Sequence, residues 1–134
     1  MDQNVPDNLQ NRINEAVLRY NRDASAHSDV TEVLSRATAP LGDVQTFCPN
    51  ASQYRYVLVS TLQIVFGFAI GMNTISFRLD PTIKARALET GGNNLTAIGP
   101  EWVSFVLFRD DWPEVDVTFL ARKAYVFARE THII

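Results

Sequence analysis

The sequence predicts a single α+β domain, residues 1–134, in which N-terminal and C-terminal helices pack on an antiparallel sheet. The central stretch, residues 56–77, contains no charged residue and alternates apolar residues with small or polar ones, which is the period of β-strands. Amphipathic helical patterns precede and follow this stretch. The 134 residues, 46% of them hydrophobic and 20% charged, suit one folded domain and exclude a disordered or collagen-like chain.

Two helices are expected before the sheet. Apolar residues recur at helical spacing from about Asp7 to Asn21, with charged and amide side chains on the other side, which predicts an amphipathic surface helix. Asp29 followed by Glu32 has the spacing of a capping box, so a second, shorter helix is expected to begin there. Pro40 ends that helix.

The sheet is expected to begin with an edge strand at residues 44–47 and to continue as a meander of three strands through residues 54–79. The tighter reversal is predicted at residues 71–72 or 72–73, and a looser one near residues 60–61. In the central stretch the large apolar residues fall mainly on even positions, which predicts strands with one heavily buried face.

The same stretch is long enough to be judged as a membrane span. Six polar residues interrupt it and its period is two, so buried strands are the favoured interpretation. The first ten residues lack the basic and apolar regions of a signal peptide, which predicts a cytoplasmic protein without membrane contact. The single cysteine, Cys48, fits a reducing compartment.

The C-terminal half continues with a helix, a strand and a helix. Asp80 precedes Pro81, and this pair is typical of a helix start; the glycines at residues 91–92 are expected to stop that helix. Residues 102–108 are apolar apart from one serine, which predicts a strand covered on both faces. A final helix is expected over residues 116–130.

No catalytic or metal-binding motif stands out. Cys48 could act as a nucleophile only with a nearby base, and the candidates are His27, in a turn, and His132, close to the C-terminal end of the sequence. The favoured interpretation is an inert, half-buried thiol. The chain also lacks the HExxH and CxxC spacings that bring metal ligands together, so no metal and no cofactor are expected.

An acidic cluster precedes the final helix. Asp110, Asp111, Glu114 and Asp116 could hold a divalent cation or supply paired carboxylates for acid–base chemistry. Carboxylates at a helix N-terminus also interact favourably with the helix dipole, and this structural role is the favoured interpretation.

A basic and aromatic stripe on the final helix is the main candidate binding feature. Arg122, Tyr125 and Arg129 are spaced three and four residues apart, and Arg78 could join them. Lys84 and Arg86 are further possible contributors to a surface for phosphate, nucleobase or an acidic partner. The alternative is that these cations only stabilise the C-terminal end of the helix, and the net charge of −3 disfavours nucleic acid.

The C-terminal half resembles the MmcQ/YjbR-like family. The similarity consists of a strand with an acidic-Pro helix start, a glycine stop, a strand that begins with Trp and a closing helix with Tyr, at residues 75–81, 91–92, 102–104 and 123–126. The closing helix departs from the family pattern at Ala124, where serine is expected. The resemblance implies a small α+β domain of frataxin-like shape, a class for which DNA binding has been suggested.

Three functions follow as hypotheses. The first is a non-enzymatic domain that binds a protein partner or its own copy, since no catalytic set converges and a long apolar sheet has edges that can pair. The second is a nucleic-acid-binding regulator that uses the basic stripe. The third is a small-molecule site lined by Trp102, Phe105 and Tyr125, against which stands the usual role of aromatic residues in the core.

Overall fold

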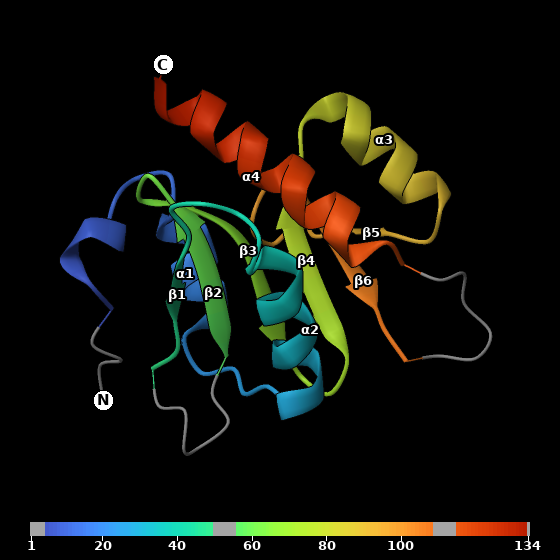
Figure 1. Cartoon of the computed structure of the whole chain (residues 1–134), viewed down its shortest axis with the longest axis horizontal. Coiled ribbons are helices and arrows are strands. Elements are labelled where there is room, and N and C mark those ends of the chain that lie inside the picture. Colours follow the sequence, from blue (N-terminus) through green and yellow to red (C-terminus); the bar gives the residue numbers. More distant parts are fainter. Residues whose placement is uncertain (1–4, 50–55, 109–114, 134) are drawn as a thin grey trace.

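The structure is a computed structural model that describes residues 5–49, 56–108 and 115–133 (Figure 1). In chain order its elements are η1 (Asp7–Leu9), α1 (Glu15–Asn21), α2 (Ser28–Thr38), β1 (Gln45–Phe47), β2 (Val57–Thr61), β3 (Ile64–Ile70), β4 (Thr74–Arg78), α3 (Pro81–Glu89), β5 (Asn93–Asn94), β6 (Trp102–Val106) and α4 (Val117–Ile133). The predicted α+β class is confirmed.

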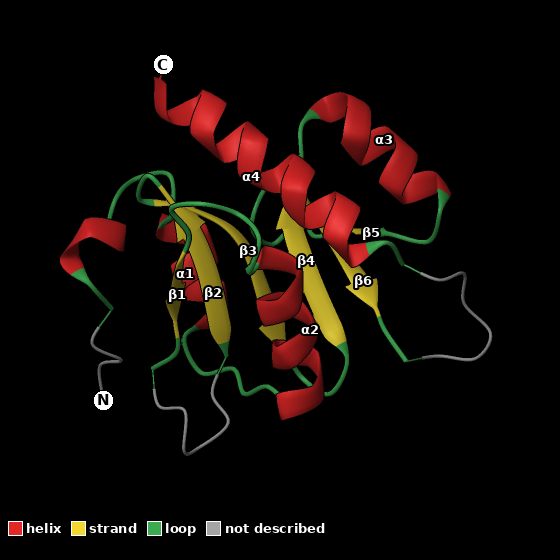
Figure 2. Ribbon diagram, in the orientation of Figure 1, coloured by secondary structure: helices red, strands yellow, loops and turns green. Residues whose placement is uncertain are grey.

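The strands form one antiparallel sheet in the order β1-β2-β3-β4-β6-β5 (Figure 2). The meander β2-β3-β4 and the edge strand β1 agree with the prediction, and β6 joins the far side of β4. The short strand β5 lies between the glycines that end α3 and the start of β6, where the sequence analysis predicts no strand. Its two residues pair with β6 and form the second edge of the sheet.

Helices cover both faces of the sheet (Figures 1 and 2). On one face the apolar sides of α2 and α4 pack against the strands, and α3 adds Ile83 and Ala87 near β6. On the other face η1 and α1 contribute Leu9 and Val17 to a second, smaller core. The sequence predicts strands with one heavily buried face. This prediction is wrong, because residues on both faces of β2, β3 and β4 are buried.

A bulge in β3 explains why the simple period is misleading. Val59 pairs with Gly67 whereas the next residue, Ser60, pairs with Val65, so Phe66 is an extra residue on β3. The bulge reverses the alternation of side chains. As a result Phe66 packs beneath α2 and α4, while Phe68, two positions later, lies in the core on the opposite face.

The two hairpin reversals differ from the prediction in tightness. β2 and β3 are joined by only two residues, Leu62 and Gln63, both with positive φ (49° and 67°). Such a two-residue turn normally uses asparagine and glycine, so the residues present here carry no turn signal. The β3–β4 connection has three residues, begins at Gly71 with φ of 67°, and lies where the tighter turn is expected.

The N-terminal helices begin differently from the prediction. The expected helix over residues 7–21 is interrupted between η1 and α1, because the buried Asn14 uses its amide to hold other segments. In α2 the N-cap is His27, whose Nδ1 accepts a hydrogen bond from the backbone N–H of Asp29 at 3.1 Å. The predicted cap at Asp29 is therefore wrong by two residues.

The later elements follow the prediction closely. Oδ1 of Asp80 accepts a hydrogen bond from the N–H of Ile83 at 2.9 Å, with Pro81 as the first residue of α3. Gly91 has φ of 110°, which few other residues adopt, and the helix ends before it. Of the described helices, none is both long and apolar enough to cross a membrane, and the uncharged stretch forms β2, β3 and β4.

Candidate functional site

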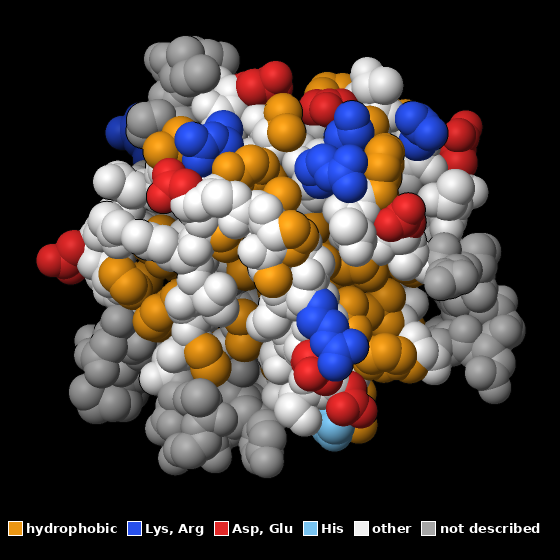
Figure 3. Space-filling model, viewed as in Figure 1, with side chains coloured by type: hydrophobic (Ala, Val, Ile, Leu, Met, Phe, Trp, Pro, Cys, Tyr) orange, Lys and Arg blue, Asp and Glu red, His pale blue; other side chains and the backbone are white. Residues whose placement is uncertain are grey.

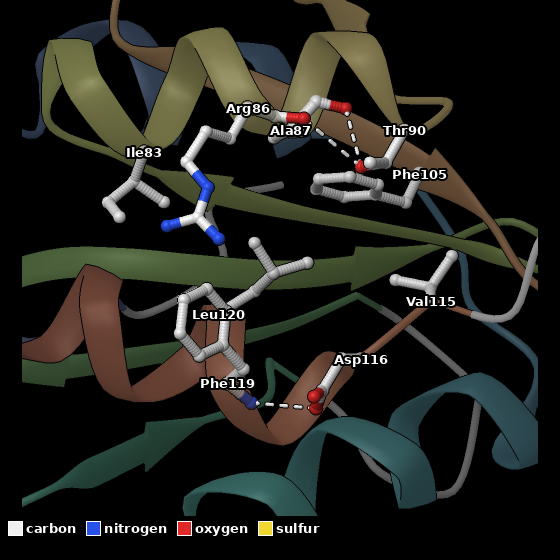
Figure 4. A pocket seen from close by; sticks show the side chains of 9 residues that line it. All are labelled: Ile83, Arg86, Ala87, Thr90, Phe105, Val115, Asp116, Phe119 and Leu120. Carbon is white, nitrogen blue, oxygen red and sulfur yellow. Dashed lines mark hydrogen bonds between the residues drawn. The ribbon is translucent and has the colours of Figure 1, made fainter.

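A pocket of 230 Å³ lies between α3 and the first turn of α4, above β6 (Figure 4). We call it the α3–α4 pocket. Its lining combines apolar side chains with three polar residues: Ile83, Arg86, Ala87, Thr90, Phe105, Val115, Asp116, Phe119 and Leu120. Concave and mainly apolar surfaces with a few polar groups are typical of binding sites.

Local sequence features place the walls of this pocket. The cap at Asp80 sets the start of α3, so that Ile83 and Ala87, four residues apart, face the sheet. At the other end of α3 the chain passes very close to β6: a Cβ on Gly92 would lie 2.6 Å from Cγ1 of Val103 and 2.9 Å from Cε2 of Phe105. Glycine at this position therefore lets the end of α3 lie directly on β6.

The start of α4 forms the opposite wall. Oδ1 of Asp116 accepts a hydrogen bond from the N–H of Phe119 at 3.0 Å, as an N-cap carboxylate does. This cap places the half-buried ring of Phe119 and the buried side chain of Leu120 toward α3 (Figure 4). The structural role predicted for the acidic cluster is thus confirmed for Asp116, whereas residues 110, 111 and 114 lie outside the described residues.

Two cations stand beside the ring of Phe119. The guanidinium carbon of Arg86, from α3, lies 6.0 Å from the ring centroid, and Nζ of Lys123, from α4, lies 5.5 Å from it. Neither cation forms an ion pair with any residue in the described ranges. Thr90 lies at the rim. Its hydroxyl donates to the backbone carbonyl oxygens of Arg86 and Ala87 in α3, at 3.2 Å from each.

The residues of the predicted basic stripe are mostly engaged inside the molecule. The hydroxyl of Tyr125 donates to the carbonyl oxygen of Gly42 at 2.5 Å. Arg129 donates to Oγ1 of Thr61 at 2.7 Å and pairs with Asp43 at 3.4 Å. These contacts tie α4 to the α2–β1 loop and to the end of β2.

Arg78 is also internal. Its Nε pairs with Oε1 of Glu101 at 3.0 Å, and its Nη1 donates to Oγ1 of Thr131 at 3.2 Å. Its guanidinium carbon lies 4.6 Å from the ring centroid of Phe127, and only 9% of the side chain is exposed. Of the four predicted stripe residues, Arg122 alone is exposed without an ion pair to a described residue.

The three aromatic residues predicted to line a small-molecule site do not converge. Trp102 is buried against Phe68, with ring centroids 5.3 Å apart, in the core beneath α1. Phe105 lies on the opposite face of the sheet and lines the α3–α4 pocket. Tyr125 packs edge-on against Phe66, with ring centroids 5.9 Å apart. The prediction therefore identifies one pocket residue of three.

The remaining candidates from the sequence are Cys48 and the two histidines. Cys48 is half-buried beside the larger core, and His27 caps α2. Within the described ranges no three His, Cys, Asp or Glu side chains gather closely enough to hold a metal ion. His132 lies outside the residues whose side chains are described.

Comparisons with known proteins found no matching family model, no matching curated protein and no matching solved structure. The resemblance to the MmcQ/YjbR-like family therefore stays a prediction. The functional argument rests on the pocket and its residues.

Proposed function

We propose that this protein is a binding domain that takes one apolar side chain of a protein partner into the α3–α4 pocket. The observation that carries the proposal is the pocket itself, whose walls come from two helices and a strand and whose lining is mainly apolar. Interfaces commonly concentrate their binding energy in an anchor side chain that fills such a pocket. The proposal includes no chemical step, and we assign it to the cytoplasm on the sequence argument.

The size of the pocket supports a side chain as the occupant. Pockets for drug-sized molecules usually measure about 300–1,000 Å³. At 230 Å³ the α3–α4 pocket is smaller. One aromatic or branched apolar side chain suits this volume, and the rest of a partner would contact the surrounding helices.

Self-association is part of this proposal, with a second copy as one candidate partner. Pairing through the sheet edges has less support, because β1 has three residues and β5 has two. Light scattering after size-exclusion chromatography tests this form of the proposal. A strict monomer at high concentration would leave a different protein as the partner.

The nucleic-acid alternative has weaker support from the geometry. Arg78, Tyr125 and Arg129 are held by internal contacts, whereas Arg122 is exposed and forms no ion pair with a described residue. Phosphate contacts are strongest at low salt. A gel-shift titration at low salt that shows no retardation would end this alternative.

Capped amino acids test the pocket directly. We expect acetyl-phenylalanine amide and acetyl-leucine amide to shift the backbone NMR signals of Ala87, Phe105 and Leu120, because their side chains can enter the pocket. Acetyl-serine amide of the same backbone should leave these signals in place. Equal shifts with the serine compound, or none at these residues with any compound, would contradict the proposal.

A blocking variant provides the matched comparison. Thr90 lies at the exposed rim of the pocket, so Thr90→Trp should fill the mouth and abolish the shifts. Thr118 is exposed on α4 and does not line the pocket, so Thr118→Trp should bind like the parent protein. If both variants bind equally well, the apolar group enters elsewhere.

A further inference from the structure

We infer that the α3–α4 pocket selects an apolar side chain that has a carboxylate beside it, as when Phe is followed by Glu in the partner. This inference rests on the proposed function and adds the chemistry of the partner segment. The charges around the mouth of the pocket support it.

Arg86 and Lys123 reach the same aromatic ring from different helices. The guanidinium carbon of Arg86 lies 6.0 Å from the centroid of Phe119 and Nζ of Lys123 lies 5.5 Å from it. Both cations therefore flank one wall residue of the pocket. Figure 4 shows the guanidinium group of Arg86 extending from α3 toward the side chains of Leu120 and Phe119.

These cations are available to a partner. Neither forms an ion pair with a residue in the described ranges, whereas Arg19, Arg36, Arg78 and Arg129 each have a carboxylate partner there. A weak contact with an aromatic face leaves most hydrogen-bond donors of a guanidinium free. A carboxylate could therefore bind Arg86 without displacing an ion pair to any described residue.

One carboxylate in the pocket lining opposes the positive charge of Arg86 and Lys123. Asp116 lines the pocket, but its Oδ1 accepts the hydrogen bond from the N–H of Phe119 at the start of α4. The positive end of the helix dipole offsets part of its charge. Glu89 also lies on α3, three residues after Arg86, but does not line the pocket. Among the described residues, the pocket lining thus holds one cation without an ion pair, Arg86, and one capping carboxylate, Asp116. Lys123 lies outside the lining, as Glu89 does, but adds a second cation beside the ring of Phe119.

The surface around the pocket agrees with this arrangement. Figure 3 shows Lys and Arg side chains over α3 and α4, with Asp and Glu side chains among them and apolar side chains exposed below them, beside α2. The chain as a whole carries a net charge of −3, so two neighbouring cations without an ion pair to a described residue are not a general property of its surface. Complementary charge at an interface rim selects partners and steers their approach.

Matched peptides test the inference. Four-residue capped peptides would contain Phe followed by Glu, Gln or Lys and otherwise be identical, with their dissociation constants measured by NMR titration. Exposed ion pairs contribute modestly, so at low salt we expect the Glu peptide to bind about fivefold more tightly than the Gln peptide. The Lys peptide should bind least tightly, and about 0.5 M salt should remove most of the difference.

Variants assign the preference to named residues. Arg86→Gln and Lys123→Gln should each reduce the preference for Glu over Gln, and the double variant should abolish it. Arg19→Gln changes the net charge equally on α1, away from the pocket, and should leave the preference intact. Asp116→Asn keeps a capping residue and removes the opposing charge, so it should increase the preference.

The outcomes separate the inference from the function on which it rests. Equal binding of the Glu and Gln peptides to the parent protein would overturn the inference and leave the apolar pocket in place. A preference that survives in the double variant would also overturn it. If no peptide shifts the signals of Phe105 and Leu120, the proposed function fails and the inference fails with it.

Discussion

The side chain of Asn14 accepts a hydrogen bond from the backbone N–H of Val65 at 2.9 Å. Through the same amide group it donates to the carbonyl oxygens of Gln63 and Leu9, at 2.8 and 2.9 Å. Asn14 is 1% exposed, so one buried side chain joins the N-terminal segment to the β2–β3 turn. This segment covers the face of the sheet opposite α2 and α4.

Removing this amide should destabilise the fold. Asn14→Ala leaves the buried N–H of Val65 without its side-chain partner and removes one of the two hydrogen bonds to the carbonyl of Leu9, and unpaired buried polar groups are costly. We expect the free energy of unfolding in urea to fall by about 2–4 kcal/mol. The amide proton of Val65 should also exchange faster. Asn8→Ala, at an exposed position, should change the stability by less than about 0.5 kcal/mol; an equal loss in both variants would contradict this role.

The turn that Asn14 holds contains a strained residue. Gln63 is exposed with φ of 67°, a conformation that costs a residue with a Cβ about 1–2 kcal/mol. Gln63→Gly should therefore raise the free energy of unfolding by about 0.5–1 kcal/mol, after the entropy that glycine adds to the unfolded chain. In the edge strand β1 the same change, Gln45→Gly, should lower it. Thermal unfolding of the two variants gives the comparison, and destabilisation by Gln63→Gly would show that the turn is not strained.

The elements that the sequence predicts well depend on neighbouring residues. The Asp80–Pro81 start of α3 and the glycine that ends it are local signals, and both are confirmed. The bulge at Phe66 and the two-residue turn before β3 depend on contacts with distant segments, Asn14 among them. The hydrophobic period and the residue types of the turn do not depend on such contacts. Neither the bulge nor the turn can therefore be predicted from them.

The candidate site is predicted less well for a related reason. The pocket joins α3, β6 and α4, and the sequence shows neither which sheet face a strand residue occupies nor which cations find internal partners. From the sequence, Arg86 is only a minor contributor to a basic surface, and Phe119 is not a candidate. The available signal is weak: Phe119 is an aromatic residue next to the apolar Leu120 in the expected final helix. By contrast, Arg78 and Arg129 form ion pairs with carboxylates of other segments of the chain.

Close packing beside the bulge gives a third prediction. A Cβ on Gly67 would lie 2.9 Å from Cδ1 of Phe77 and 3.2 Å from Cγ2 of Val59, both in the larger core. Gly67→Ala should therefore lower the free energy of unfolding by about 1–3 kcal/mol, measured in urea. A Cβ on Gly99 would have no atom within 4 Å, so Gly99→Ala should be neutral or slightly stabilising. Equal stability of both variants would mean that the core accommodates the added methyl group at position 67 without loss of stability.

Two ion pairs of nearly equal length should differ in their contribution because they differ in burial. Arg78 pairs with Glu101 at 3.0 Å and its side chain is 9% exposed, whereas Arg36 pairs with Glu32 at 3.1 Å and is 78% exposed. Arg78→Met keeps an apolar stem but removes the pair and the hydrogen bond to Thr131, and should cost about 2 kcal/mol in urea unfolding. Arg36→Met breaks a solvated pair and should cost less than about 0.5 kcal/mol. Equal losses would mean that charge, and not burial, determines the contribution of these arginines. An Arg78→Met variant as stable as the parent would mean that apolar packing on Phe127 alone suffices at this position.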